Sequence, residues 1–272
     1  MNRPEIAIAK QASGSVWDQL RLEAAAIVQN QDVINSLVTK VILNANSFEQ
    51  ALALRLAVRL SGDEVSTADL LGLFEKALMS DAQIAESAKA DLLATLDRDP
   101  ACHRIIDPFL YFKGWHAIQA YRIAHAYWKQ GKKDIGYLIQ SRTSLVTSID
   151  IHPAAQIGEG LMIDHGHDVV IGETCVIDDN VSMMQGVTLG GNGKEFGDRH
   201  PKIKSGVLVG AGAKILGNIT IGQCSRVAAG SVVLHSVPPN TTVAGVPAKV
   251  VGNSGSKEPA KIMNHQIEDD EG

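Results

Sequence analysis

The residues best suited to chemistry lie close together near the middle of the chain. From position 150 to position 167 this stretch supplies three histidines and two aspartates: Asp150, His152, Asp164, His165 and His167. Histidine has an unperturbed pKa near neutrality, so it suits a general base that takes a proton from a hydroxyl group. A carboxylate on the second ring nitrogen sets the tautomer and stabilises the imidazolium that forms. These residue types predict acid–base chemistry here.

The elements that position these residues are indicated by aliphatic residues that recur every six positions. They form three frames: Ile151, Ile157 and Ile163; Ile171, Ile177, Met183 and Leu189; and Ile203, Val209, Ile215, Ile221, Val227 and Val233. A fixed six-residue period is typical of a parallel β-helix, in which three short strands make one coil of a triangular prism. Residues 149 to about 235 are therefore predicted to form such coils.

The spacing within this repeat suggests which residues meet. Asp150 and His165 are fifteen residues apart, close to one coil of three hexads, so they are predicted to face each other across adjacent coils. Each junction between frames carries two extra residues, and at the second junction Gly190–His200 is predicted to be an extruded loop. A loop held on rigid coils is a common place for binding groups.

The rest of the chain divides around the coils, so the fold class is α+β. Residues 1–148 are predicted to be an α-helical domain for oligomer contacts, because apolar residues recur there at three- and four-residue spacing. Ser66-Thr67-Ala68-Asp69 opens one helix as a capping box does. Residues 149–252 form the β-helix domain, which ends in a strand or cap over the last coil. Residues 253–272 are polar and then acidic, which predicts a disordered tail.

Composition excludes several classes of protein. A net charge of -5 argues against nucleic-acid binding. The chain contains no apolar run as long as a membrane span. An apolar signal core is missing after the first residues, so a cytoplasmic location is expected. The three cysteines form no CxxC pair, and they are interpreted as small hydrophobic residues.

Several motifs resemble the serine O-acetyltransferase family of hexapeptide-repeat acetyltransferases. Within the coils they are Asp150-Ile-His-Pro-Ala-Ala, Asp164-His165, Gly186-Val-Thr-Leu-Gly-Gly and Gly197-Asp-Arg-His-Pro-Lys. Others are Arg98-Asp99-Pro100, Lys113-Gly-Trp-His-Ala-Ile-Gln-Ala-Tyr-Arg, Gly210-Ala-Gly-Ala-Lys-Ile-Leu-Gly-Asn and Ala244-Gly-Val-Pro-Ala-Lys. The resemblance covers most of residues 98 to 252. Hexads alone are shared by many acyltransferases, whereas this combination of motifs is specific.

The resemblance implies both architecture and activity. The β-helix would be left-handed, and the chains would form trimers and dimers of trimers through the helical domain. The enzyme would transfer acetyl from acetyl-CoA to the hydroxyl of L-serine, without a metal, and would act in cysteine biosynthesis. His165 matches the family's catalytic base and Asp150 its orienting partner, so direct attack without a covalent acyl-enzyme is expected.

The resemblance also implies contacts for an amino-acid zwitterion. Asp99 and Asp164 match positions that hold the ammonium group, and Arg199 and His200 match those near the carboxylate, which the planar arginine fork suits. His152 and His116 are interpreted as structural, and the role of His167 is open. Small residues would let acetyl-CoA approach the backbone, and basic residues would contact its phosphates: Gly191, Gly193, Ala211 and Ala229, with Lys194, Arg226 and Lys249.

Three other functions compete with this one. The acceptor could be a sugar or another alcohol or amine, although the acidic and basic contacts suit an amino acid. A zinc protein could take three imidazoles from His152, His165, His167 and His200. The third alternative is a scaffold without catalysis that organises a cysteine synthase partner.

The resemblance also concerns regulation and partners. L-cysteine is expected to be a feedback inhibitor, because it offers the same ammonium and carboxylate groups as serine. Many family members bind O-acetylserine sulfhydrylase through a C-terminal isoleucine. Here Ile267 is followed by five residues and the chain ends in glycine, so a weak or absent complex is expected.

Overall fold

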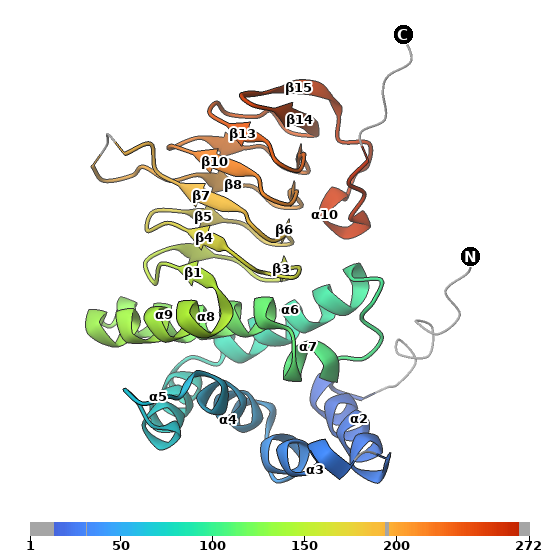
Figure 1. Ribbon diagram of the computed structural model, residues 1–272, viewed down its shortest axis with the longest axis vertical. Helices are drawn as coiled ribbons and strands as arrows, with labels where there is room; N and C mark the ends of the chain where they lie inside the picture. The colour runs from blue at the N-terminus through green and yellow to red at the C-terminus, as the bar shows by residue number, and fades with distance from the viewer. Residues whose placement is uncertain (1–13, 31, 194–195, 267–272) are drawn as a thin grey trace.

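The computed structural model describes residues 14–30, 32–193 and 196–266, with a helical part at one end and a stack of β-coils at the other (Figure 1). The elements before the first strand are α2 (Val16–Asn30), α3 (Asp32–Val38), the π-helix η1 (Thr39–Leu43), α4 (Phe48–Leu60), α5 (Thr67–Ser80), α6 (Gln83–Arg98), α7 (Ile106–Leu110), α8 (Lys113–Lys129) and α9 (Lys133–Thr147). The side chain of Ser66 accepts a hydrogen bond from Asp69 N at the start of α5. The predicted cap at Ser66 is therefore confirmed.

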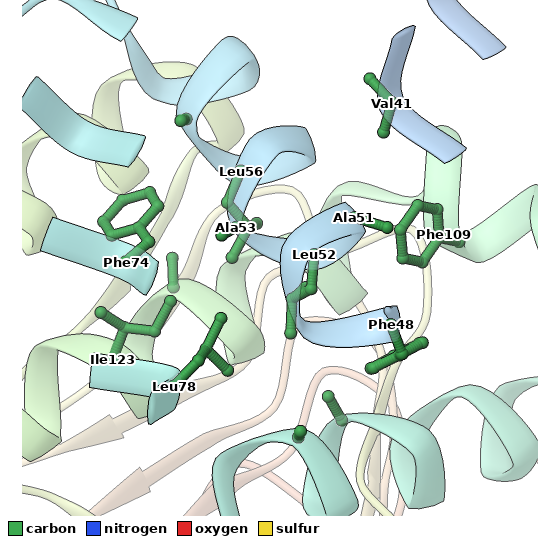
Figure 2. Packing of buried hydrophobic residues seen from close by; sticks show 14 of the residues in the cluster. Val41, Phe48, Ala51, Leu52, Ala53, Leu56, Phe74, Leu78, Phe109 and Ile123 are labelled. Carbon is green, nitrogen blue, oxygen red and sulfur yellow. The ribbon is translucent and has the colours of Figure 1, made fainter. Parts of the chain in front are cut away.

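The helical part has its own hydrophobic core. Phe48, Leu52 and Leu56 of α4 belong to a buried cluster with Phe74 of α5 and Phe109 of α7 (Figure 2). The ring centroids of Phe48 and Phe109 are 5.9 Å apart. Among the helices of the described ranges, none has the length and apolar character to cross a membrane.

The strands that follow build the predicted parallel β-helix. They are β1 (Ile149–Ile151), β2 (Gln156–Ile157), β3 (Met162–Ile163), β4 (Val169–Ile171), β5 (Val176–Ile177), β6 (Ser182–Met183), β7 (Thr188–Gly190), β8 (Lys202–Ile203), β9 (Leu208–Val209), β10 (Lys214–Leu216), β11 (Thr220–Ile221), β12 (Arg226–Val227), β13 (Val232–Val233), β14 (Thr241–Gly245) and β15 (Ala248–Asn253). Up to β13, every third strand joins the same sheet, and the sheets are β1-β4-β7-β10-β13, β11-β8-β5-β2 and β15-β14-β12-β9-β6-β3. Strand β14 then pairs with β12, and β15 pairs antiparallel with β14 as a cap on the last coil. The registered aliphatic residues are buried inside the prism, apart from the half-buried Ile157.

Strand pairing shows where the coils depart from a regular repeat. Ile171 pairs with Leu189 and Ile215 pairs with Val233, each eighteen positions further on. Ile151 pairs with Ile171 twenty positions on, and Leu189 pairs with Ile215 twenty-six positions on. The two additional residues lie in the turn from β3 to β4, and the eight additional residues lie between β7 and β8. The first junction agrees with the prediction; the second carries eight additional residues and not the predicted two, because the fourteen positions from Leu189 to Ile203 span one strand step and not two. Both junctions place candidate site residues.

A buried polar network joins the helices to the first coil. Asp91 of α6 is fully buried, and its carboxylate accepts hydrogen bonds from Arg122 Nη2 at 2.7 Å, Gln119 Nε2 at 3.0 Å and Leu161 N at 2.8 Å. Arg122 also donates to Gly158 O at 2.7 Å. Since a buried charge needs a partner, this network locks α6 and α8 onto the coils.

The segment after β15 differs from the expected disordered tail. Residues 254–266 fold back along the prism and include α10 (Pro259–Ile262), which lies beside β6 in Figure 1. Ala260 is buried, its carbonyl accepts a hydrogen bond from Ser182 Oγ at 2.7 Å, and its N–H donates to Gly206 O. We call residues 254–266 the strap. Its few apolar residues pack against a surface of the folded coils, and composition alone does not reveal that surface. The acidic residues and Ile267 lie outside the described residues.

Candidate active site

His165 lies on a turn that the two additional residues of the first coil create. Residues 164–168 connect β3 to β4, with positive φ at His165 (55°), Gly166 (61°) and Asp168 (57°). The His165 side chain is 71% exposed, and its Nε2 lies 3.7 Å from Asp164 Oδ2. Asp164 Oδ1 accepts a hydrogen bond from His165 N at 2.8 Å. The turn therefore presents the imidazole to solvent beside a carboxylate.

Two carboxylates and a second histidine surround this turn. Burial raises the pKa of Asp164, the neighbouring His165 opposes the rise, and the charge of Asp99 adds to it. His265 of the strap lies close enough to interact electrostatically with Asp164. The structure thus brings together Asp99, Asp164 and His165, as the candidate site requires. An anionic pair of this kind is suited to an ammonium group.

Asp150 does not pair with His165 within the chain. It lies in the middle of β1, where its Oδ1 accepts a hydrogen bond of 2.6 Å from Gln140 Nε2 of α9. No hydrogen bond or ion pair joins it to His165 in the described chain; the carboxylate near His165 is that of Asp164. The expected contact across adjacent coils is absent because His165 occupies a corner of the prism and Asp150 a flat face.

A second group of candidate residues lies along a different edge. The Arg199 edge comprises residues 152–155, 172–175, 191–193 and 196–201, which lead from the five-stranded into the four-stranded sheet. Arg199 Nη2 forms an ion pair with Glu173 Oε2 at 2.8 Å. Hydrogen bonding to Arg199 lowers the pKa of Glu173, which remains an anion. Arg199 and His200 are thus together, but apart from the turn that carries His165.

Thr174 determines how His200 is presented. Its Oγ1 accepts hydrogen bonds from Arg199 N at 3.0 Å and His200 N at 3.1 Å. His200 Nδ1 accepts from Thr174 N at 3.2 Å and lies 2.9 Å from Thr174 Oγ1. Burial lowers the pKa of His200, with Arg199 adding to the effect. A neutral imidazole whose Nδ1 accepts hydrogen bonds carries its proton on Nε2, so His200 offers an N–H donor.

The ring of His200 also depends on a glycine. A Cβ on Gly172 would lie 2.1 Å from His200 Cδ2 and 2.2 Å from Nε2. Sequence reasoning missed Gly172, Glu173 and Thr174 as parts of the site. The signal available was their position in the sequence. They directly follow the registered residue Ile171, one coil before the predicted Gly190–His200 loop.

Two other histidines have supporting positions. His116 is fully buried, its Nε2 lies 2.8 Å from Phe109 O, and burial lowers its pKa to about 3. His152 Nδ1 accepts a hydrogen bond from Ala154 N at 3.1 Å, and its ring packs edge-on against Trp128 and Tyr137. The structural interpretation of both is confirmed by these contacts.

The surroundings of His167 do not indicate one particular role. Its Nδ1 lies 3.3 Å from Lys113 Nζ on α8. Within the part of the chain that the structure describes, no three His, Cys, Asp or Glu side chains are grouped to hold a metal. His152 and His200 belong to the Arg199 edge, whereas His165 and His167 lie on the turn from β3 to β4. The four histidines proposed for zinc are therefore not brought to one point.

The candidate coenzyme residues divide between the same two edges. The His165 edge comprises residues 164–168, 184–187, 210–213 and 228–231, which lead into the five-stranded sheet and include Ala211 and Ala229. Here Gly186 and Gly212 have φ of 71°, and a Cβ on Gly186 would lie 3.2 Å from Gly212 Cα. Only small residues fit such stacked turns. The His165 edge is therefore a narrow strip with accessible backbone above the imidazole.

The remaining coenzyme candidates lie in different surroundings. Gly191 and Gly193 lie on the Arg199 edge, and Lys249 is exposed on β15. Lys194 lies outside the described residues. Arg226 differs from expectation: it is 8% exposed, and its guanidinium donates to Thr242 Oγ1 at 3.3 Å and to Asn264 O of the strap at 3.1 Å. The guanidinium is held by these two contacts and is not presented as a free phosphate ligand.

Known families match both parts of the chain. Residues 16–120 match the N-terminal family of serine acetyltransferases, and residues 200–235 match the bacterial transferase hexapeptide repeats. Coils of hexads with a histidine on a strip of small residues define a hexapeptide-repeat acyltransferase. The serine acetyltransferase of Salmonella typhimurium is 45% identical over 252 residues, which are 93% of this chain and 92% of that protein. The chain belongs to the serine acetyltransferase family.

Solved structures of serine acetyltransferases share the fold. The Brucella abortus enzyme, in complex with coenzyme A, is 52% identical with a TM-score of 0.86, covering 88% of this chain and 95% of that one. A soybean enzyme complexed with serine is 46% identical with a TM-score of 0.85, covering 87% and 97%. A complex with cysteine is 44% identical with a TM-score of 0.91, covering 93% and 98%.

Proposed function

We propose that this enzyme transfers the acetyl group of acetyl-CoA to the hydroxyl of L-serine, giving O-acetyl-L-serine and CoA for cysteine biosynthesis. Family membership supports the reaction, and the relatives bound to coenzyme A and to serine support its two substrates. One observation in the chain itself carries the proposal. His165 with Asp99 and Asp164 lies on one edge of the coils, and Arg199 with His200 lies on another.

These two edges form one site when two chains pack side by side. Each chain then contributes its His165 edge to one neighbour and its Arg199 edge, with Asp150, to the other. A closed ring is the arrangement in which every such head-to-tail contact is satisfied, and hexapeptide-repeat proteins are typically trimeric. Residues 1–148 would join two such trimers, residues 149–252 would hold the sites, and the enzyme would work in the cytoplasm.

Serine would be held by both of its charged groups. Its ammonium group binds between Asp99 and Asp164. Burial raises the pKa of Asp164 and the charge of Asp99 adds to the rise, so a bound ammonium would favour the ionised form of this carboxylate. Its carboxylate binds Arg199 and the Nε2–H of His200 from the neighbouring chain. A sugar acceptor lacks both charges and would leave these groups unpaired, which explains the preference for an amino acid.

Acetyl transfer then follows from the position of the base. His165 takes the proton of the serine hydroxyl as its oxygen attacks the thioester carbon, and Asp150 of the neighbouring chain stabilises the imidazolium. The tetrahedral intermediate collapses, the carbon–sulfur bond breaks, and the CoA thiolate takes the proton back from His165. The pantetheine arm lies along Ala211 and Ala229 opposite Gly191 and Gly193, and Lys249 meets the phosphates.

Thiol release from acetyl-CoA, measured against a panel of hydroxyl and amino acceptors, tests this function. We expect release that depends on L-serine and falls at least about a hundredfold in His165→Ala, the lower end of what a positioned general base contributes. Equal release with sugars, or near-normal turnover in folded His165→Ala, would contradict the proposal.

A further inference from the structure

The half-buried side chain of Gln140 contacts Asp150, the carboxylate that orients the base in the proposed mechanism. Gln140 on α9 donates from Nε2 to Asp150 Oδ1 at 2.6 Å. Its own Oε1 is buried, and none of the described residues donates a hydrogen bond to it. A buried acceptor without a partner costs free energy, which the hydrogen bond to Asp150 must offset.

We propose that Gln140 is a positioning residue that holds the carboxylate of Asp150 for catalysis; this inference rests on the proposed function of Asp150. An ionised carboxylate only accepts hydrogen bonds, so the glutamine must turn its NH2 toward Asp150 and its oxygen away. One carboxylate oxygen is then fixed. The described residues give Oδ2 no hydrogen bond, which leaves that oxygen for the imidazole N–H of His165 in a neighbouring chain.

The support of this contact is rigid. Helix α9 ends at Thr147 and β1 begins at Ile149, with only Ser148 between them at φ 60°. Thr147 Oγ1 donates to Thr143 O at 2.7 Å and accepts from Ile149 N at 3.2 Å. Helix and strand therefore form one unit, so the amide of Gln140 has a defined position relative to Asp150.

The chain contains a matched control. Gln119 on α8 is fully buried, donates from Nε2 to Asp91 Oδ2 at 3.0 Å and, like Gln140, has an Oε1 to which no described residue donates a hydrogen bond. Asp91 pairs with Arg122 between the helices and the coils, away from both edges of the site. The same substitution at the two glutamines thus separates catalytic positioning from a general effect of a lost buried hydrogen bond.

Steady-state kinetics of the full-length enzyme test the inference. Gln140→Met is expected to lower kcat about tenfold to a hundredfold, the range for a hydrogen bond to a charged group, with the KM for acetyl-CoA nearly unchanged. Gln119→Met is expected to keep the wild-type kcat in the folded fraction. In an Asp150→Asn background, Gln140→Met should cost little more, because coupled residues are not additive. Gln140→Glu, of the same shape, serves if Gln140→Met does not fold, and should also lower kcat.

Several results would overturn the inference. They are a wild-type kcat in the folded Gln140 variant, an equal loss in Gln119→Met, and full additivity with Asp150→Asn. If instead Asp150→Asn itself keeps the wild-type kcat, the mechanism under Proposed function fails, and with it the role of Gln140. A loss in Asp150→Asn without a loss at Gln140 overturns the positioning role alone.

Discussion

Gly172→Ala is predicted to damage serine binding without touching the base. The new Cβ would lie 2.1 Å from His200 Cδ2 and 2.2 Å from Nε2. Ordinary contact begins at 3.4 Å, so the ring must withdraw by more than 1 Å. It cannot do so and keep Nδ1 at 3.2 Å from Thr174 N and 2.9 Å from Thr174 Oγ1. Misplacement on this scale at a binding group costs up to about a hundredfold in rate.

Serine kinetics measure the effect. We expect kcat/KM for serine to fall about tenfold to a hundredfold, with the KM for acetyl-CoA close to wild type. Gly72→Ala is the control, because a Cβ there meets nothing within 4 Å and should stabilise α5 by about 0.5–1 kcal/mol. A folded Gly172→Ala enzyme with wild-type kcat/KM for serine would refute the placement of His200 in the serine site.

Four further predictions follow from particular contacts. Arg122→Met should cost about 3–5 kcal/mol in urea unfolding, since it leaves the buried carboxylate of Asp91 unpaired; a loss below about 1 kcal/mol would contradict this. Burial lowers the pKa of His116 to about 3. The contribution of this histidine to the free energy of unfolding is therefore complete above about pH 6.5 and falls on acidification, by roughly 3 kcal/mol at pH 4.5. His116→Met should reduce this loss of stability at acidic pH, and an unchanged loss would disprove the prediction. L-cysteine should inhibit competitively with serine and more weakly in Arg199→Ala, and equal inhibition of both enzymes would argue against a shared site. A synthetic peptide with the sequence of residues 263–272 should bind O-acetylserine sulfhydrylase at least about tenfold more weakly than the same peptide with an isoleucine added at its end, because it lacks the apolar anchor; comparable submicromolar binding by both peptides would refute that.

The coils were predictable because each hexad must place one aliphatic residue in the interior of the prism, and this requirement appears in the sequence as a six-residue period. Ile171 and Leu189 face the interior in the expected register, and the irregular spacings located both functional turns. The predicted contact between Asp150 and His165 across adjacent coils was wrong for one chain, and spacing within the chain could not reveal a contact that would require the packing of two. The position of His165 on a corner follows from the two additional residues of its coil, which shift it away from the flat face.

The supporting residues leave little trace in the sequence. Thr174 acts on Arg199 and His200, which lie 25 and 26 positions away, and no spacing rule connects them. The strap escaped detection for another reason. Its polar composition resembles a disordered tail, yet Ala260 reaches a groove beside Ser182 that only the folded coils create.

Activity of mixed trimers tests most directly the claim that serine acetylation occurs at a site shared by two chains. His165→Ala and Asp150→Asn chains should each be inactive alone. If equal amounts of the two variants assemble at random into the proposed trimers, about one interface in three joins an intact His165 to an intact Asp150 in each mixed trimer, and about one in four over all trimers, because each chain gives one edge to each neighbour. The account predicts that serine-dependent release of CoA returns to about a quarter of the wild-type rate. Mixed trimers as inactive as the single variants would contradict it.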